Sequence, residues 1–236
     1  MFDRHKAKAV LDVASSVAVI AAAAVLIWSV VGRPGTTSAS NSAAARGDTL
    51  TDTHIPAEAA RHVQGTGAQV IVEFSDYQCP FCASFAQSTL PEAERELISS
   101  GKARYITFHY PLEATHPLAM KASEAVECAS QQGKHWDMHK RLFANQAALS
   151  PEALLAHADA LQLNRSQFEE CFAGDATNIV KADMAQGRRL GVTATPTFFL
   201  GSVAENGDIR LEKRITGSIS FTQLRAELST LKEVTQ

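Results

Sequence analysis

"IVEFSDYQCPFCASFAQ", residues 71–87, is the stretch that decides the fold. It begins as a run of strand-forming residues, breaks at a Ser-Asp pair and continues as a helical pattern of apolar residues. Two cysteines, Cys79 and Cys82, stand at the start of that helical pattern, with Pro80 and Phe81 between them. Such a pair can be half of a metal clip, a structural disulfide or a reactive redox pair.

The redox interpretation fits this position best. A zinc site usually needs four ligands in two close pairs, and the two remaining cysteines are isolated. A disulfide between Cys79 and Cys82 closes a ring too small to save much chain entropy. At a helix start, free backbone N–H groups and the helix dipole favour the thiolate of Cys79, the attacking species, and Cys82 is then the resolving thiol. Pro80 suits a helix start and Phe81 adds no charge, so the helix terminus is the main stabiliser of the thiolate.

The N-terminus carries an apolar run of twenty residues without a charge, 13–32. Its length matches a helix that crosses a bilayer. Basic residues within 1–12 predict a cytoplasmic N-terminus, and hence a single-pass inner-membrane protein whose C-terminal domain lies in the periplasm or another extracytoplasmic space. A cleaved signal peptide, which leaves a soluble periplasmic protein, is the alternative. Export permits disulfides, so the even count of four cysteines is informative.

After this segment the chain divides into a spacer and one folded domain. Residues 33–67 are rich in small and polar residues and are predicted to be a flexible linker with a short helix near residues 57–63. Residues 68–236 are predicted to form an α/β domain with a helical insertion at about residues 115–191.

The predicted domain opens with a strand, a helix and a second strand. Such a unit implies a parallel strand pair with a right-handed crossover. Pro91 is expected to kink or split the helix. After the insertion, two strands separated by an Asn-Gly turn predict an antiparallel hairpin. The predicted elements outside the insertion are strands at 69–74, 103–112, 195–201 and 208–217 and helices at 80–99 and 221–233.

A strand leading into C-x-x-C, a large helical insertion and a distant Thr-Pro that opens another strand resemble the DsbA-like branch of the thioredoxin-fold thiol-disulfide oxidoreductases. The resemblance covers roughly residues 70–232. It implies a thioredoxin-like central sheet with an inserted helical subdomain, preceded here by one transmembrane helix. It rests on "EFSDYQCPFC" (73–82), "HPLAMKASEAVECA" (116–129), "GKHWDMHKRLF" (133–143) and "GVTATPTFFLG" (191–201).

The resemblance implies roles for further residues. Pro196 matches the family's cis-proline beside the cysteine pair, which leaves the backbone of Thr195 free to bond an extended substrate strand; a trans proline that starts a strand is the alternative. Pro80 and Phe81 are assigned to the same substrate-binding surface. Glu73 matches the family's buried acid that shuttles a proton to or from the resolving thiol, and burial should raise its pKa. A solvated strand carboxylate is the alternative for Glu73.

The other cysteines and the histidines are interpreted as structural. Cys128 and Cys171 lie 43 positions apart in the insertion, and a structural disulfide of the kind that some relatives carry is the simplest outcome in an exported domain. Two buried free thiols are the alternative, and a second redox relay is disfavoured. His135 and His139 share a helix face but are predicted to be exposed beside basic residues. No metal ligand is assigned to them or to His116.

The sequence therefore predicts an exported, membrane-anchored thiol-disulfide oxidoreductase, expected to be a monomer, that donates a disulfide to reduced exported client proteins. A quinone-linked membrane partner, DsbB-like or similar, must then reoxidise it. No cofactor and no nucleic-acid partner are expected, because no phosphate-binding glycine loop is present and the net charge is -3. The alternatives are a reductase or isomerase for cytochrome or copper-protein maturation, and a non-catalytic client-binding module around Pro196.

Overall fold

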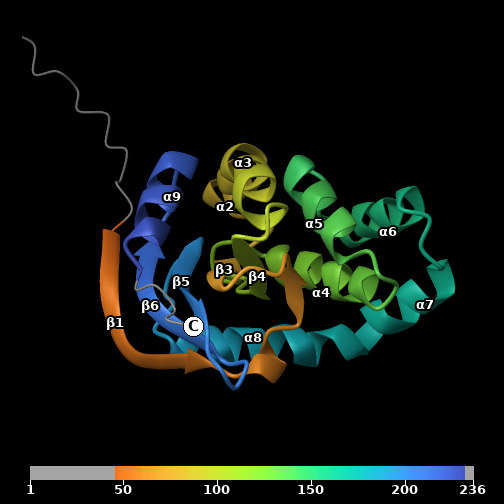
Figure 1. The fold of residues 1–236 in the computed structure, drawn as a ribbon. Helices are drawn as coiled ribbons and strands as arrows, with labels where there is room; N and C mark the ends of the chain where they lie inside the picture. The colour runs from red at the N-terminus through yellow and green to blue at the C-terminus, as the bar shows by residue number, and fades with distance from the viewer. Residues whose placement is uncertain (1–45, 232–236) are drawn as a thin grey trace, which may run out of the picture. The chain divides into compact units, whose positions relative to one another are not determined.

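Six strands form one mixed sheet in the part of the chain that the structure describes, in the order β1-β6-β5-β3-β4-β2 (Figure 1). The structure is a computed structural model, and it describes residues 46–231. β3 and β4 run parallel, and every other neighbouring pair is antiparallel. The predicted α/β class is confirmed. The strands are β1 (Arg46–Ile55), β2 (His62–Gln64), β3 (Gln69–Ser75), β4 (Ala103–His109), β5 (Thr197–Val203) and β6 (Ile209–Thr216).

The predicted cytoplasmic segment, residues 1–12, the predicted transmembrane anchor, residues 13–32, and the first part of the predicted linker lie outside the described residues. Within residues 46–231, every helix falls short of the length and apolar character that crossing a membrane requires.

Helices cover both faces of the sheet and add a lobe beside it (Figure 1). α2 (Pro80–Ser84), α3 (Leu90–Ala93) and α9 (Phe221–Ser229) pack on the face that buries Ile71. α8 (Ala176–Arg189) packs on the opposite face, against Phe74. The two faces use alternate residues of β3, as a strand buried on both sides requires. The lobe is the predicted insertion, and its other helices are α4 (Ala119–Ser130), α5 (His135–Ala144), α6 (Pro151–Ala160) and α7 (Arg165–Glu170).

Pro91 does not end the helix that follows the cysteines. α2 and α3 belong to one helical run, residues 80–98, in which Phe85–Thr89 and Glu94–Ile98 form wider π-turns. The N–H of Leu90 bonds the carbonyl of Phe85, five residues back, and Pro91 then occupies the first turn of α3. The π-turn accommodates a residue that has no N–H to donate, so the expected kink takes the form of a local widening.

The predicted linker is partly a piece of the sheet. β1 pairs with β6 from Arg46↔Thr216 to Ile55↔Ile209, and β2 pairs with β4. The helix expected near residues 57–63 is only a 3-10 turn, Ala57–Ala59, followed by β2. The prediction was wrong here because β1 is an edge strand of mostly polar residues. Its backbone hydrogen bonds, rather than an apolar alternation, hold it in place.

The insertion has a core of its own, closed by a disulfide. Ala122, Ala125 and Ala129 of α4 are fully buried, and such small side chains let neighbouring helices approach closely. The structure joins Cys128 of α4 to Cys171, the residue after α7, with an Sγ–Sγ distance of 2.06 Å. The bond thus ties the end of α7 to α4 within the lobe.

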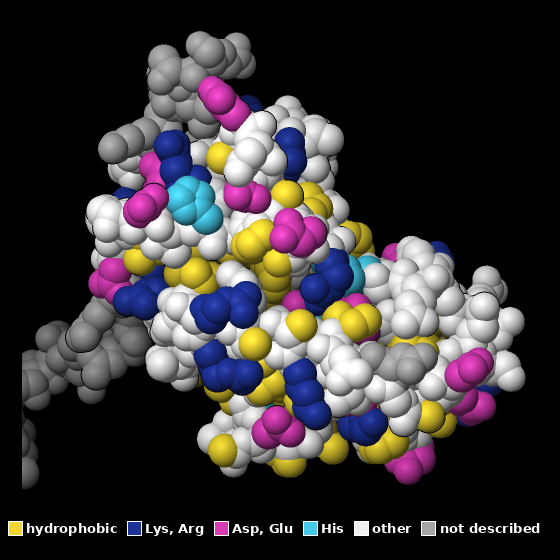
Figure 2. All heavy atoms as spheres, turned by 90° about the horizontal axis from the view of Figure 1, so that it is seen from below, with side chains coloured by type: hydrophobic (Ala, Val, Ile, Leu, Met, Phe, Trp, Pro, Cys, Tyr) yellow, Lys and Arg dark blue, Asp and Glu magenta, His cyan; other side chains and the backbone are white. Residues whose placement is uncertain are grey.

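Figure 2 views the domain from the side of α8, where Lys and Arg side chains gather in the middle of the face and Asp and Glu side chains lie around them. α8 exposes three basic residues, Lys181, Arg188 and Arg189. The last two stand in its final turn, where positive charge interacts favourably with the negative end of the helix dipole.

Replacing both Cys128 and Cys171 with alanine should lower the free energy of unfolding by about 4 kcal/mol. The disulfide joins residues 43 positions apart and so restricts a long loop of the unfolded chain. Urea unfolding of the oxidised parent and of the double variant measures the difference. The rate of thiol exchange at Cys79 should stay unchanged, which serves as the control. An unfolding free energy equal to that of the parent would contradict this role.

Candidate active site

Cys79 lies at the junction of β3 and α2. It is the N-cap residue of α2, with extended backbone angles of φ -73° and ψ 122°, and Pro80 occupies the first turn. Its carbonyl accepts the N–H of Ala83 at 3.1 Å. The backbone N–H groups of Phe81 and Cys82 donate to the sulfur of Cys79. A negative charge on this sulfur therefore meets the free donors of a helix start.

The turn before α2 is held by side chains from two other segments. The carboxylate of Asp76 is fully buried and accepts the backbone N–H groups of Gln78 and Leu112, both at 2.8 Å. Nδ1 of His116 lies 2.8 Å from the same carboxylate, so this histidine belongs to the support of the turn. The amide of Gln146 donates to the carbonyl of Cys79 at 2.9 Å. The position of the first cysteine is thus fixed from outside its own helix.

The two thiols have opposite acidities. The thiol of Cys82 donates a hydrogen bond to the sulfur of Cys79, and this bond, against the opposing effect of burial, is the main cause that lowers the pKa of Cys79 from 9.0 to about 6. Burial is the main cause that raises the pKa of Cys82 well above 9.0, and the bond to Cys79 and the charge of Glu73 act in the same direction. At neutral pH the reduced pair therefore consists of a thiolate at Cys79 and a thiol at Cys82.

Glu73 lies on the α2 side of the sheet and is 1% exposed. The hydroxyl of Ser75 donates to its Oε1 at 2.7 Å, and the hydroxyl of Tyr105 donates to its Oε2. Burial outweighs these two bonds and raises the pKa of Glu73 to about 7, and the negative charge of Cys79 adds to the rise. A carboxyl group with this pKa can both take up and release a proton near neutral pH.

The peptide bond between Thr195 and Pro196 is cis. The thiol of Cys79 donates to the carbonyl of Thr195 at 3.4 Å, so this loop lies directly beside the cysteine pair. Both residues between the two cysteines, Pro80 and Phe81, are exposed, and Phe81 is 62% exposed. The sulfur of Cys79 and the backbone of Thr195 are thus in direct contact, and the residues between the two cysteines are exposed next to them.

His135 and His139 are buried, at 6% and 1% exposure, so the prediction that they are exposed was wrong. Nε2 of His135 lies 3.2 Å from the hydroxyl of Thr107, and Nδ1 of His139 lies 3.0 Å from the hydroxyl of Tyr77. Of the basic neighbours, Lys134 precedes α5, Lys140 is exposed and Arg141 is half-buried. Both histidines share the buried face of α5 with Leu142. Burial lowers the pKa of His139 to about 3, so its ring is neutral.

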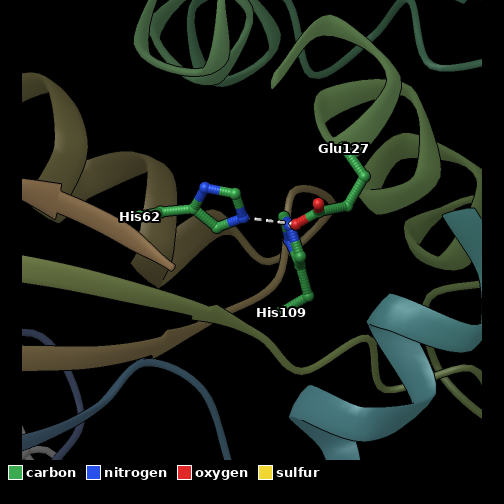
Figure 3. A group of neighbouring side chains, drawn as sticks. All are labelled: His62, His109 and Glu127. Atoms are coloured by element: carbon green, nitrogen blue, oxygen red, sulfur yellow. Dashed lines mark hydrogen bonds and ion pairs between the residues drawn. The ribbon is translucent and has the colours of Figure 1, made fainter. Parts of the chain in front are cut away.

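Three residues that sequence reasoning did not single out meet next to these histidines: His62 of β2, His109 of β4 and Glu127 of α4 (Figure 3). Burial works against ionisation of Glu127, but hydrogen bonds from His109 and His62 outweigh it and lower the pKa of Glu127 well below its usual range. The two histidines are 65 and 18 positions away from Glu127, so no local motif could have revealed the cluster.

Comparisons with known proteins agree with this fold. A family model described as thioredoxin matches residues 58–214. The fold is similar to that of oxidised BdbD from Bacillus subtilis, with a TM-score of 0.62, 19% identity and coverage of 77% of this chain and 97% of that one. It is also similar to DsbA2 from Pseudomonas aeruginosa, with a TM-score of 0.59, 23% identity and coverage of 74% and 96%.

A curated relative has a different name. Na(+)/H(+) antiporter NhaA 1 of Salinispora arenicola is 34% identical over 184 residues, which are 75% of this chain and 28% of the antiporter. The chain thus spans little more than a quarter of the length of that relative.

Replacing Cys82 separates the effect of its hydrogen bond from that of the helix start. Cys82→Ala removes the donor and should move the pKa of Cys79 from about 6 up toward the ordinary 9.0, whereas Cys82→Ser keeps a hydroxyl donor and should raise it less. The rate of alkylation of Cys79 by iodoacetamide, followed against pH, gives the midpoint in each variant. A midpoint that stays at about 6 in both variants would show that the bond is unimportant.

Glu73→Gln should slow the attack of Cys82 on a mixed disulfide by roughly 10²-fold, because the amide cannot accept the thiol's proton. Release of glutathione from a Cys79–glutathione adduct measures this step in a single turnover. In the parent the rate should rise with pH through about 7, the pKa of Glu73, and this step in the profile should vanish in the variant. Glu96→Gln, on the surface, is the control. An unchanged profile in Glu73→Gln would exclude the proton-shuttle role.

Proposed function

The chain belongs to the thioredoxin family, and we propose that it is a thiol-disulfide oxidoreductase that introduces disulfide bonds into exported proteins. The observation that carries this proposal is the contrast within the cysteine pair, a stabilised thiolate at Cys79 next to a buried thiol at Cys82. The cis Thr195–Pro196 loop beside Cys79 supports it further, since it offers backbone groups to an extended client.

The reaction starts from the oxidised pair. A client thiolate attacks Sγ of Cys79, the Cys79–Cys82 bond breaks, and the sulfur of Cys82 takes up a proton, for which the buried carboxyl group of Glu73 is the proposed donor. A second client thiolate then attacks the client sulfur of the mixed disulfide, and Cys79 leaves as a thiolate. The client loses two electrons and gains a disulfide, and the enzyme pair gains the two electrons as a thiolate and a thiol.

The proposed direction of electron flow rests on how stable Cys79 is as a thiolate leaving group. A disulfide is reduced more readily when its reduced form is stabilised, and the low pKa of Cys79 stabilises that form as a thiolate. The pair is therefore an oxidant toward ordinary client thiols. After each turnover the enzyme is left reduced, so the cycle needs an electron acceptor. We propose a quinone-linked membrane reoxidase for this step, and reduced exported proteins as clients.

We further propose that the domain works outside the cytoplasm as a monomer tethered to the inner membrane. The apolar segment at residues 13–32 and the basic residues before it support the tether and the orientation. The disulfide between Cys128 and Cys171 supports an oxidising compartment. We do not extend the name of the antiporter to this chain, because the shared part is 28% of that protein.

Two measurements test whether the cysteine pair oxidises client thiols. Equilibration with glutathione buffers should give a potential clearly above the roughly -270 mV of thioredoxin, and a potential as reducing as that would contradict the proposed direction. Cys82→Ala should trap clients as mixed disulfides on Cys79 under oxidising export conditions, while Cys79→Ala should trap none. If Cys82→Ala also accumulates no client, or if cells tolerate Cys79→Ala without loss of function, a non-catalytic client-binding role is favoured.

A further inference from the structure

Two imidazoles and one carboxylate meet where strands β2 and β4 of the sheet face helix α4 of the insertion (Figure 3). Nε2 of His62 lies 2.5 Å and Nε2 of His109 lies 2.8 Å from the same oxygen, Oε1 of Glu127. All three residues are buried, at 8%, 2% and 3% exposure. The redox chemistry proposed for Cys79 and Cys82 uses none of them.

The donor set suits a particular class of metal ion. Two imidazole nitrogens and one carboxylate oxygen are a common set for zinc, and imidazole also suits copper, nickel and iron, whereas calcium and magnesium prefer oxygen ligands throughout. Among the described residues, this is the cluster whose three donor atoms all lie within 4.8 Å of one another. With these three protein ligands, a four-coordinate ion would need one further ligand, such as water.

The distances allow an ion after a small adjustment. Ligand atoms in a tetrahedral zinc site, each about 2.0 Å from the metal, lie about 3.3 Å from one another. The contacts of 2.5 and 2.8 Å to Glu127 must therefore widen by less than 1 Å. Rotation of the Glu127 side chain provides such movement, because its carboxylate projects from α4 toward the two strands (Figure 3).

The nitrogens can also present lone pairs to an ion. In each neutral ring, the proton must sit on Nδ1 for Nε2 to coordinate. The hydroxyl of Ser130 lies 3.5 Å from Nδ1 of His62 and can accept that proton in a hydrogen bond. Such an outer partner orients a ligating histidine and is typical of metal sites. The metal-free alternative is the hydrogen-bonded cluster as it stands, in which both histidines donate to Glu127.

We propose that His62, His109 and Glu127 bind one divalent transition-metal ion of the zinc class. The ion would fasten α4 of the insertion to β2 and β4 at the edge of the sheet, since each ligand comes from a different element. Its role is structural, and it does not depend on the function proposed for the cysteine pair. The dication would also compensate the buried charge of Glu127.

The test uses the full-length chain with Cys79→Ser and Cys82→Ser, because free thiolates bind zinc themselves. Isothermal titration with zinc should show one ion per chain, and zinc should raise the melting temperature in a way that a chelator reverses. Cobalt should give the absorption spectrum of a four-coordinate site without thiolate charge transfer. His109→Gln and Glu127→Gln should each weaken zinc binding by at least about 100-fold.

Two further variants complete the comparison. His157→Gln removes another buried histidine, which bonds the carbonyl of Ala148 in the insertion, and should leave zinc binding unchanged. Ser130→Ala should weaken zinc binding by roughly 10-fold. Circular dichroism shows whether each ligand variant folds, and if one does not, Ser130→Ala still tests the site in a folded protein. The proposal is overturned if the parent binds no zinc, if His109→Gln and Glu127→Gln bind as tightly as the parent while folded, or if Ser130→Ala and His157→Gln behave alike.

Discussion

The carboxylate of Asp76 is the contact on which the site depends. It stands between the end of β3 and the start of α2, and it accepts backbone N–H groups from its own turn and from Leu112, at the entrance to the helical insertion. The turn must bring Cys79 to the N-cap position with extended backbone angles, because only there do the free N–H groups of α2 face its sulfur. One buried side chain thus couples the sheet, the reactive helix and the inserted lobe.

A single low-dielectric region then gives neighbouring groups different acidities. Burial raises the pKa of Glu73 and of Cys82, since neither finds enough partners to compensate for the loss of water. Cys79 is almost as buried, but the donors of Cys82 and of the helix start reverse the effect. Glu127 is stabilised as a carboxylate by two histidines. Hydrogen-bond donors, rather than depth alone, decide which group carries a charge.

The sequence predicted the parts of this molecule that depend on local patterns. The strand before Cys79, the helix after it and the hairpin near Pro196 follow from apolar periodicity and turn residues. β1 was missed because an edge strand of polar residues has no such period, and its partner β6 is more than 150 residues away. The burial of His139 was missed because its basic neighbour Lys140 is exposed on α5 while His139 is buried. The His62, His109 and Glu127 cluster exists only in three dimensions.

The segment assigned to a linker has one more consequence. In the order β1-β6-β5-β3-β4-β2, it supplies both outermost strands, one at each border of the sheet. Open strand borders recruit extended peptides, which would be a hazard for a protein that handles unfolded chains. β1 is interrupted by an irregularity between Thr49 and Thr53, where Asp52 adopts a φ of 54°, and β2 is only three residues long. Both borders are therefore poor templates for further pairing. The backbone at Thr195, where we propose that clients bind, instead adjoins β5, a strand in the interior of the sheet.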